Sequence, residues 1–93
     1  MLAYRAAYKL EDGIYLGEVL DFAGTVSCGN TLDEARQNLA AALVDMAETN
    51  LLRGEALPVP DPARTDETAD LEEPIHLVLQ AGHRLNVSAT ALP

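Results

Sequence analysis

Three acidic residues near the start of the chain are the first candidates for chemistry. Asp12 lies in an expected turn, Glu18 on the strand after it, and Asp21 just beyond that strand. A metal-dependent nuclease needs several carboxylates that converge on one or two divalent cations. These three are spread over turns and strand faces. The pattern therefore favours solvated acids over a metal centre.

Cys28, His76 and His83 are the remaining residues that could bind a metal or pair as nucleophile and base. Their spacing matches no zinc-binding pattern, and no fourth ligand accompanies them. We interpret His76 as a residue on the polar face of a strand and Cys28 as a small apolar packing residue. The sequence thus predicts no catalytic residue, no metal and no cofactor.

The composition bounds the class of protein. The chain has 93 residues, 48% of them hydrophobic, which suits one folded domain. Its formal charge is −9, because 15 acidic residues outnumber 6 Lys and Arg. Nucleic-acid affinity depends on basic side chains, so a solitary nucleic-acid binder is disfavoured, as is binding to an anionic membrane. The charge suits a basic protein partner, but acids that only keep the protein in solution would give the same balance.

The expected location follows from the cysteine count and the start of the chain. The single cysteine, Cys28, cannot form an intramolecular disulfide, which fits a reducing cytoplasm. The first residues lack the order of a signal peptide, and no apolar run reaches the length of a membrane span. We expect a soluble cytoplasmic protein.

Positions 31 to 54 predict one long amphipathic helix. Thr31 and Glu34 have the spacing of a capping box, in which each side chain accepts a hydrogen bond from the backbone amide of the other. Gly54 suits the left-handed conformation that ends a helix. Apolar residues recur at steps of three and four, and this stripe should pack in the core. The stripe consists of Leu32, Ala35, Leu39, Ala42, Leu43 and Met46.

Three strands are expected before this helix. Residues 2–10 alternate as a half-buried strand does, an Asp-Gly turn follows at 12–13, and the chain returns over 14–20. A second turn leads to a short strand over 25–28. Because the connections are short, the three strands should form an antiparallel meander. The pattern leaves open which face of the second strand is buried, that of Ile14, Leu16 and Leu20 or that of Tyr15 and Val19.

The chain changes character after the helix. Residues 58–70 are rich in proline and acid, which predicts an extended, mobile linker. A further strand is expected after Pro74, where apolar and polar residues alternate again. The pattern then fits a turn over 81–83 and a short strand over 84–87, and the last residues should fray.

These elements divide the chain into three parts. Residues 1–57 form a β-β-β-α core, residues 58–70 form the linker, and residues 71–93 supply the C-terminal strand or strands and a tail. The last part either completes the same domain or mediates oligomerisation. The predicted fold class is α+β: an antiparallel three-stranded meander, one long helix packed on it and one further C-terminal strand.

Three stretches together resemble the HicB-like antitoxin family. Residues 11–24 read Glu-Asp-Gly-Ile-Tyr-Leu-Gly-Glu-Val-Leu-Asp-Phe-Ala-Gly, residues 29–35 read Gly-Asn-Thr-Leu-Asp-Glu-Ala, and residues 57–60 read Leu-Pro-Val-Pro. The family has an acidic-Gly hairpin and a Tyr-containing strand before an Asp-Leu-Pro-Gly turn. A Gly-Asp-Thr-Leu-x-Glu-Ala helix start and a Leu-Pro-x-Pro tail follow. The resemblance covers roughly residues 3 to 60.

The chain also departs from the family pattern. Ala23 stands where the family usually has Pro, and Thr25 where it often has Cys. Many family members carry a carboxy-terminal helix-turn-helix or ribbon-helix-helix that binds operator DNA. The residues after Pro74 show no helical pattern, so the resemblance does not extend to DNA binding.

The resemblance implies a partial ribonuclease-H-like fold and a homodimer or homotetramer. It also implies a partner, a small basic HicA-type messenger-RNA endonuclease whose catalytic histidine the antitoxin would cover. Asp12, Glu18 and Asp21 are then expected to face the toxin. Two alternatives stay open: a stand-alone oligomeric HicB-like domain with a structural or regulatory role, and a degenerate ribonuclease-H-like nuclease that uses Glu18 and Asp21. Fold alone does not decide among them.

Overall fold

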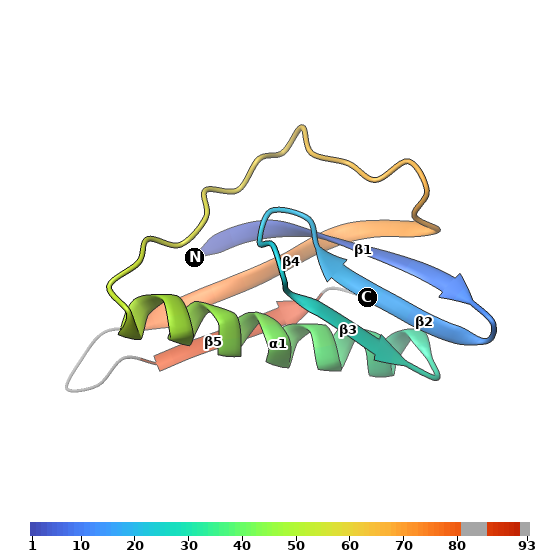
Figure 1. The fold of residues 1–93 in the computed structure, drawn as a ribbon, viewed down its shortest axis with the longest axis horizontal. Helices are drawn as coiled ribbons and strands as arrows, with labels where there is room; N and C mark the ends of the chain where they lie inside the picture. Colours follow the sequence, from blue (N-terminus) through green and yellow to red (C-terminus); the bar gives the residue numbers. More distant parts are fainter. Residues whose placement is uncertain (81–85, 92–93) are drawn as a thin grey trace.

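The computed structural model describes residues 1–80 and 86–91, which form one antiparallel sheet and one helix (Figure 1). The strand order is β3-β2-β1-β4-β5, and the helix packs on the inner face of this sheet. The fold is therefore of the α+β class that the sequence predicts. In chain order the elements are β1 (Leu2–Glu11), β2 (Ile14–Val19), β3 (Val26–Gly29), α1 (Leu32–Leu52), β4 (Leu71–Gln80) and β5 (Asn86–Ala91).

The first three strands form the predicted meander. Asp12 and Gly13 make the β1–β2 turn, with φ angles of 51° and 79° in the left-handed region that two-residue hairpin turns use. On its other side β1 pairs with β4, from Leu2 opposite Leu77 to Tyr8 opposite Leu71. The first strand of the chain is thus the middle strand of the sheet.

The long helix α1 begins at its expected cap. Thr31 is the N-cap residue, and its hydroxyl accepts a hydrogen bond from the Glu34 backbone amide at 3.1 Å. Gly54 follows the helix with a φ of 71°. In the described residues, no helix is both long and apolar enough to cross a membrane.

One row of the helix lies fully in the core. Ala35, Leu39, Leu43 and Ala47 recur every four residues, and none is exposed to solvent. Of the other residues placed in the core stripe, Leu32 and Met46 are partly buried at its margin. This i, i+4 row faces the sheet, and Ala47 continues it one turn beyond Leu43. Ala42, also expected in the stripe, is partly exposed. The sheet supplies Tyr4, Ala6, Tyr8, Val19, Ile75 and Leu77 to the same core.

The buried face of β2 is the one that carries Tyr15, Gly17 and Val19. Val19 is buried and Tyr15 packs against the core, whereas Ile14 and Leu16 point to the outer face and are 43% and 40% exposed. Gly17 lies opposite Tyr8 in β1, and a Cβ there would meet the Tyr8 ring at 3.0 Å. The large tyrosine ring is accommodated by a residue without a side chain. Hydrophobicity alone did not indicate this face because its middle residue is glycine.

The strand β4 starts earlier than expected. It begins at Leu71, so Pro74 lies inside the strand, opposite Arg5 of β1. The described pairing of β5 with β4 begins only at Ile75, so β4 has no partner on that side at Pro74. Proline, which lacks a backbone N–H, is tolerated at such an unpaired position. β5 spans Asn86–Ala91, later than the strand expected over 84–87. The turn expected over 81–83 lies outside the described residues.

Residues 58–70, called the strap below, connect the helix to β4 along the sheet (yellow to orange in Figure 1). The composition predicts a mobile linker, but the strap is attached along its length. The Tyr4 hydroxyl donates to the Pro58 carbonyl at 2.7 Å, and the Arg64 guanidinium donates to the Leu20 carbonyl at 3.0 Å. Near its end the Asp70 amide donates to the Tyr8 carbonyl at 2.9 Å.

Candidate partner-binding surface

The face of the sheet that points away from the helix carries the exposed side chains of β1, β2 and β3. The strand register places Lys9 opposite Leu16, and Glu18 opposite both Ala7 and Val26. Side chains directly opposite each other in antiparallel strands lie on one face. We call this surface the outer face, and at the β2–β3 side it consists of Ala7, Lys9, Glu11, Ile14, Leu16, Glu18, Val26 and Cys28.

A hollow of about 350 Å³ lies on the outer face, between the strands and the strap. Its apolar part includes Leu16 and Val26, which are 40% and 61% exposed. Apolar side chains grouped on an exposed surface are typical of sites that bind another protein. Its charged part consists of Lys9, Glu11, Glu18 and Asp66.

The charges around this hollow do not balance. The Lys9 ammonium lies 3.1 Å from the Asp66 carboxylate. Hydrogen bonds from Thr68, and then Lys9, hold the pKa of Asp66 below its usual value. Within residues 1–80 and 86–91, the carboxylates of Glu11 and Glu18 take part in no ion pair and no side-chain hydrogen bond. The hollow therefore keeps a negative surplus.

The three acids singled out from the sequence do not share one environment. Asp12 is exposed at the tip of the β1–β2 hairpin, and Glu18 is exposed on the outer face. Asp21 is only 9% exposed, and its two oxygens each accept a backbone hydrogen bond at 3.2 Å, from Arg5 and from Asp61. Two of the three acids are free to meet a partner, whereas Asp21 joins β1 to the strap.

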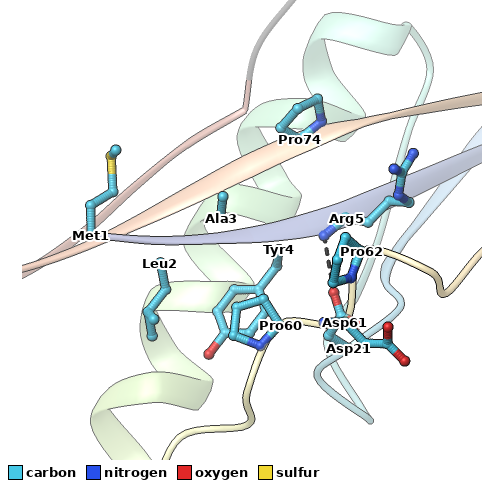
Figure 2. A pocket seen from close by; sticks show the side chains of 10 residues that line it. All are labelled: Met1, Leu2, Ala3, Tyr4, Arg5, Asp21, Pro60, Asp61, Pro62 and Pro74. Carbon is cyan, nitrogen blue, oxygen red and sulfur yellow. Dashed lines mark hydrogen bonds between the residues drawn. The ribbon is translucent and has the colours of Figure 1, made fainter.

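Asp21 also borders a second hollow, a groove of about 540 Å³ at the start of β1 (Figure 2). Figure 2 shows Pro60 and Pro62 of the strap beside this strand, with the Arg5 amide pointing at Asp21. Burial, and then the charge of Asp21, raise the pKa of the Tyr4 phenol at this end of the sheet. The Asp21 carboxylate is already engaged, so this groove brings no free acid and base together.

The histidine and cysteine residues do not converge on a site. Cys28 is exposed on the outer face of β3, so its expected role in packing is wrong. His76 lies on the outer side of β4, opposite Ala3 and Thr90, and His83 lies outside the described residues. In the part of the chain that the structure describes, no group of three or more His, Cys, Asp or Glu residues is placed to hold a metal ion. Glu18 is exposed on the outer face, whereas the Asp21 carboxylate accepts hydrogen bonds from the Arg5 and Asp61 amides.

Sequence reasoning missed a charged cluster under the helix. Arg36 of α1 makes a bidentate pair with Glu73 of β4 at 2.7 and 3.0 Å. The Glu73 side chain is only 9% exposed. This pair raises the pKa of the Arg36 guanidinium, chiefly through the hydrogen bond to Glu73. The sequence holds one sign of this pair: Glu73 lies two residues before Ile75 and four before Leu77, so it shares their inner face and needs a basic partner there.

The comparisons with known proteins agree with this geometry. The sequence matches a family model described as UPF0150-like over residues 4–58, which span β1 to the start of the strap. The structure is similar to the crystal structure of the N-terminal domain of the antitoxin HicB from Burkholderia pseudomallei, with a TM-score of 0.69 and 25% sequence identity. That similarity covers 78% of this chain and 94% of the HicB domain chain. No curated protein matches the chain.

Proposed function

We propose a function from one premise: the chain belongs to the UPF0150-like family and has the fold of a HicB-like antitoxin domain. The protein binds and neutralises a small basic ribonuclease of the HicA type, without chemistry of its own. In this role it acts in the cytoplasm, where its toxin would cleave messenger RNA. The solved HicB domain is described as part of an antitoxin, which supports this reading of the shared fold.

The observation that carries the proposal is the outer face. It combines exposed apolar side chains with carboxylates that have no partner in the described residues. An apolar centre with uncompensated acids suits a basic protein surface, because complementary potentials speed association and fix orientation. The net charge of −9 extends the same preference to the whole molecule. Asp12 and Glu18 are the acids that we assign to the toxin interface.

Affinity capture from the native host, followed by mass spectrometry of the bound proteins, tests the proposal. We expect a small basic protein at a stoichiometric amount at moderate salt, released at high salt because screening weakens exposed charge pairs. Recovery of this chain alone would contradict the antitoxin function.

A second candidate function is a stand-alone oligomeric domain with a structural or regulatory role. The exposed Ile14, Leu16 and Val26 favour it, because an apolar patch also suits self-association. The expected result is then a defined homodimer or homotetramer with no other protein bound. The same capture experiment, with the molar mass measured by light scattering, separates the two candidates.

DNA binding is not part of the proposal. Within the described residues, the chain after the strap forms the strands β4 and β5, and the helix that precedes the strap packs on the sheet. Neither strand offers the helix that a helix-turn-helix would place in the major groove. The surplus of acidic residues also disfavours contacts to phosphate.

A further inference from the structure

We propose that the hollow on the outer face receives a basic side chain, lysine or arginine, from the toxin. This inference rests on the proposed function and adds the place on this chain where the two proteins interlock. The hollow of about 350 Å³ opens between β1, β2, β3 and the strap. Its decisive residues are Lys9, Glu11, Leu16, Glu18, Val26 and Asp66.

The apolar part of the hollow suits the stem of a long basic side chain. Leu16 and Val26 present exposed aliphatic carbons, and the buried Ala7 lies between them and the strap. Lysine and arginine bury their methylene stems against such surfaces while the charged head stays at a polar rim. A purely apolar occupant would leave the acids of the rim without compensation, and burying an uncompensated charge is unfavourable.

The polar part of the hollow selects a cation. The hollow is lined by three acids and one lysine, and the lysine already lies 3.1 Å from Asp66. Glu11 and Glu18 therefore remain to pair with an incoming positive charge. An occupant with a carboxylate or phosphate would add to the negative surplus, so anionic ligands are disfavoured.

A second copy of this chain is a poorer occupant than a basic partner. Three of its described basic side chains are already engaged: Lys9 with Asp66, Arg36 with Glu73, and Arg64 with the Leu20 carbonyl. Arg5 and Arg53 are the other two that the structure describes, against a net charge of −9. A copy would also carry the same net charge of −9 toward the hollow. A different protein with surplus lysine and arginine meets both the apolar and the charged requirement.

Charge reversal at the hollow, with a matched control elsewhere, tests the inference. The variants are Glu18→Lys and Leu16→Ser in the hollow, and Glu48→Lys on the exposed side of α1, which leaves the outer face unchanged. The probe is the basic protein recovered by affinity capture and purified, and its affinity is measured by calorimetry at moderate salt. Circular dichroism and thermal unfolding confirm that each variant is folded.

We expect Glu18→Lys to weaken binding by at least about 30-fold, since loss of one partner of a buried charge pair has an effect of this size. Leu16→Ser should weaken it in the same direction, and Glu48→Lys should change it by less than about threefold. Exchange of one lysine or arginine of the probe for glutamate should restore its binding to the Glu18→Lys variant.

The possible failures are distinguishable. If the basic protein binds the wild type and all three variants alike, the hollow is not the docking place, and the antitoxin function stands. If Glu48→Lys weakens binding as strongly as Glu18→Lys, only the net charge matters, and the inference is wrong. If no basic protein binds the wild type, the proposed function fails and the inference fails with it.

Discussion

At the scale of single residues, two acids accept hydrogen bonds from β1 where this strand lacks a neighbouring strand. β1 pairs with β2 from Ala6 onward and with β4 only up to Tyr8, so each end of β1 is unpaired on one side. The Arg5 amide donates to Asp21 at one end, and the Leu10 amide donates to Asp70 at the other, at 2.8 Å. Carboxylates thus replace the missing carbonyl partners of the central strand.

Removing the Asp21 carboxylate should destabilise the fold. In Asp21→Ala the Arg5 and Asp61 amides both lose their acceptor, and we expect a loss of about 1–3 kcal/mol in the free energy of unfolding. The matched control Glu18→Ala removes an exposed acid and should change stability by less than about 0.5 kcal/mol. Urea unfolding of both variants measures this difference. Equal stabilities would show that Asp21 does not hold the strap to β1.

The buried Tyr8 phenol should titrate late. Burial raises its pKa from the ordinary value of 10.0 to about 12, with the Glu73 carboxylate adding to the rise and Arg36 opposing it. Because the pKa is higher in the folded state, this contribution to stability is complete below about pH 10 and is lost as the pH rises toward 12. Wild-type stability should therefore fall more steeply over this interval than that of Tyr8→Phe.

An absorbance titration of tyrosinate in the two proteins checks the same point, since Tyr8→Phe should remove the last transition. At neutral pH the variant should be at least as stable as the wild type, because the Tyr8 hydroxyl is buried with no hydrogen-bond partner among the described residues and its removal relieves a desolvation cost. A clear loss of stability at neutral pH would mean that the hydroxyl does have a partner.

At the scale of elements, the contact between β3 and α1 explains why a glycine precedes the helix start. A Cβ on Gly29 would lie 2.5 Å from the Ala35 backbone nitrogen, closer than real Cβ atoms approach. The Ser27 hydroxyl donates to the Ala35 carbonyl, and the Asn38 amide donates to the Cys28 carbonyl at 2.8 Å. The short edge strand β3 is therefore fixed to the first turns of α1.

The helix face can be tested by truncation. Leu39→Ala and Leu43→Ala should each lower the free energy of unfolding by about 2–5 kcal/mol, because both side chains are completely buried. Leu52→Ala is the control, since Leu52 is 87% exposed at the end of the same helix, and it should have little effect. Changes below about 0.5 kcal/mol at both buried positions would contradict the packing of α1 described above.

Most elements could be predicted from local patterns, and those that could not depend on distant contacts. The cap at Thr31, the Asp-Gly turn and the alternation in β1 each lie within a few residues, so the sequence shows them directly. The sequence pattern predicts that β4 begins after Pro74, because proline is typical of a strand boundary. The strand instead begins at Leu71, and Pro74 is tolerated inside it because the described pairing with β5 starts only at Ile75. The burial of Arg36 against Glu73 joins residues far apart in the chain, and no local pattern indicates it.

At the scale of the whole molecule, the helix covers one face of the sheet, and the strap borders the other face, to which we assign partner binding. The helix buries the inner face and leaves the outer face open at β2 and β3, where the strap forms one border of the hollow. The sequence predicts three partner-facing acids, Asp12, Glu18 and Asp21; the first two are exposed, whereas Asp21 is buried, and their binding role stays a prediction. The sequence could not predict the hollow, because that shape depends on where Asp66 of the strap meets Lys9.

The claim that this chain is an antitoxin is tested most directly by RNA cleavage with the purified basic protein that it captures. The account predicts that this protein cleaves messenger RNA alone, and that cleavage stops when this chain is added in stoichiometric amount. Restoration of cleavage at high salt would agree with an interface of complementary charges. A captured protein without nuclease activity, or cleavage that continues unchanged in the presence of excess chain, would contradict the account.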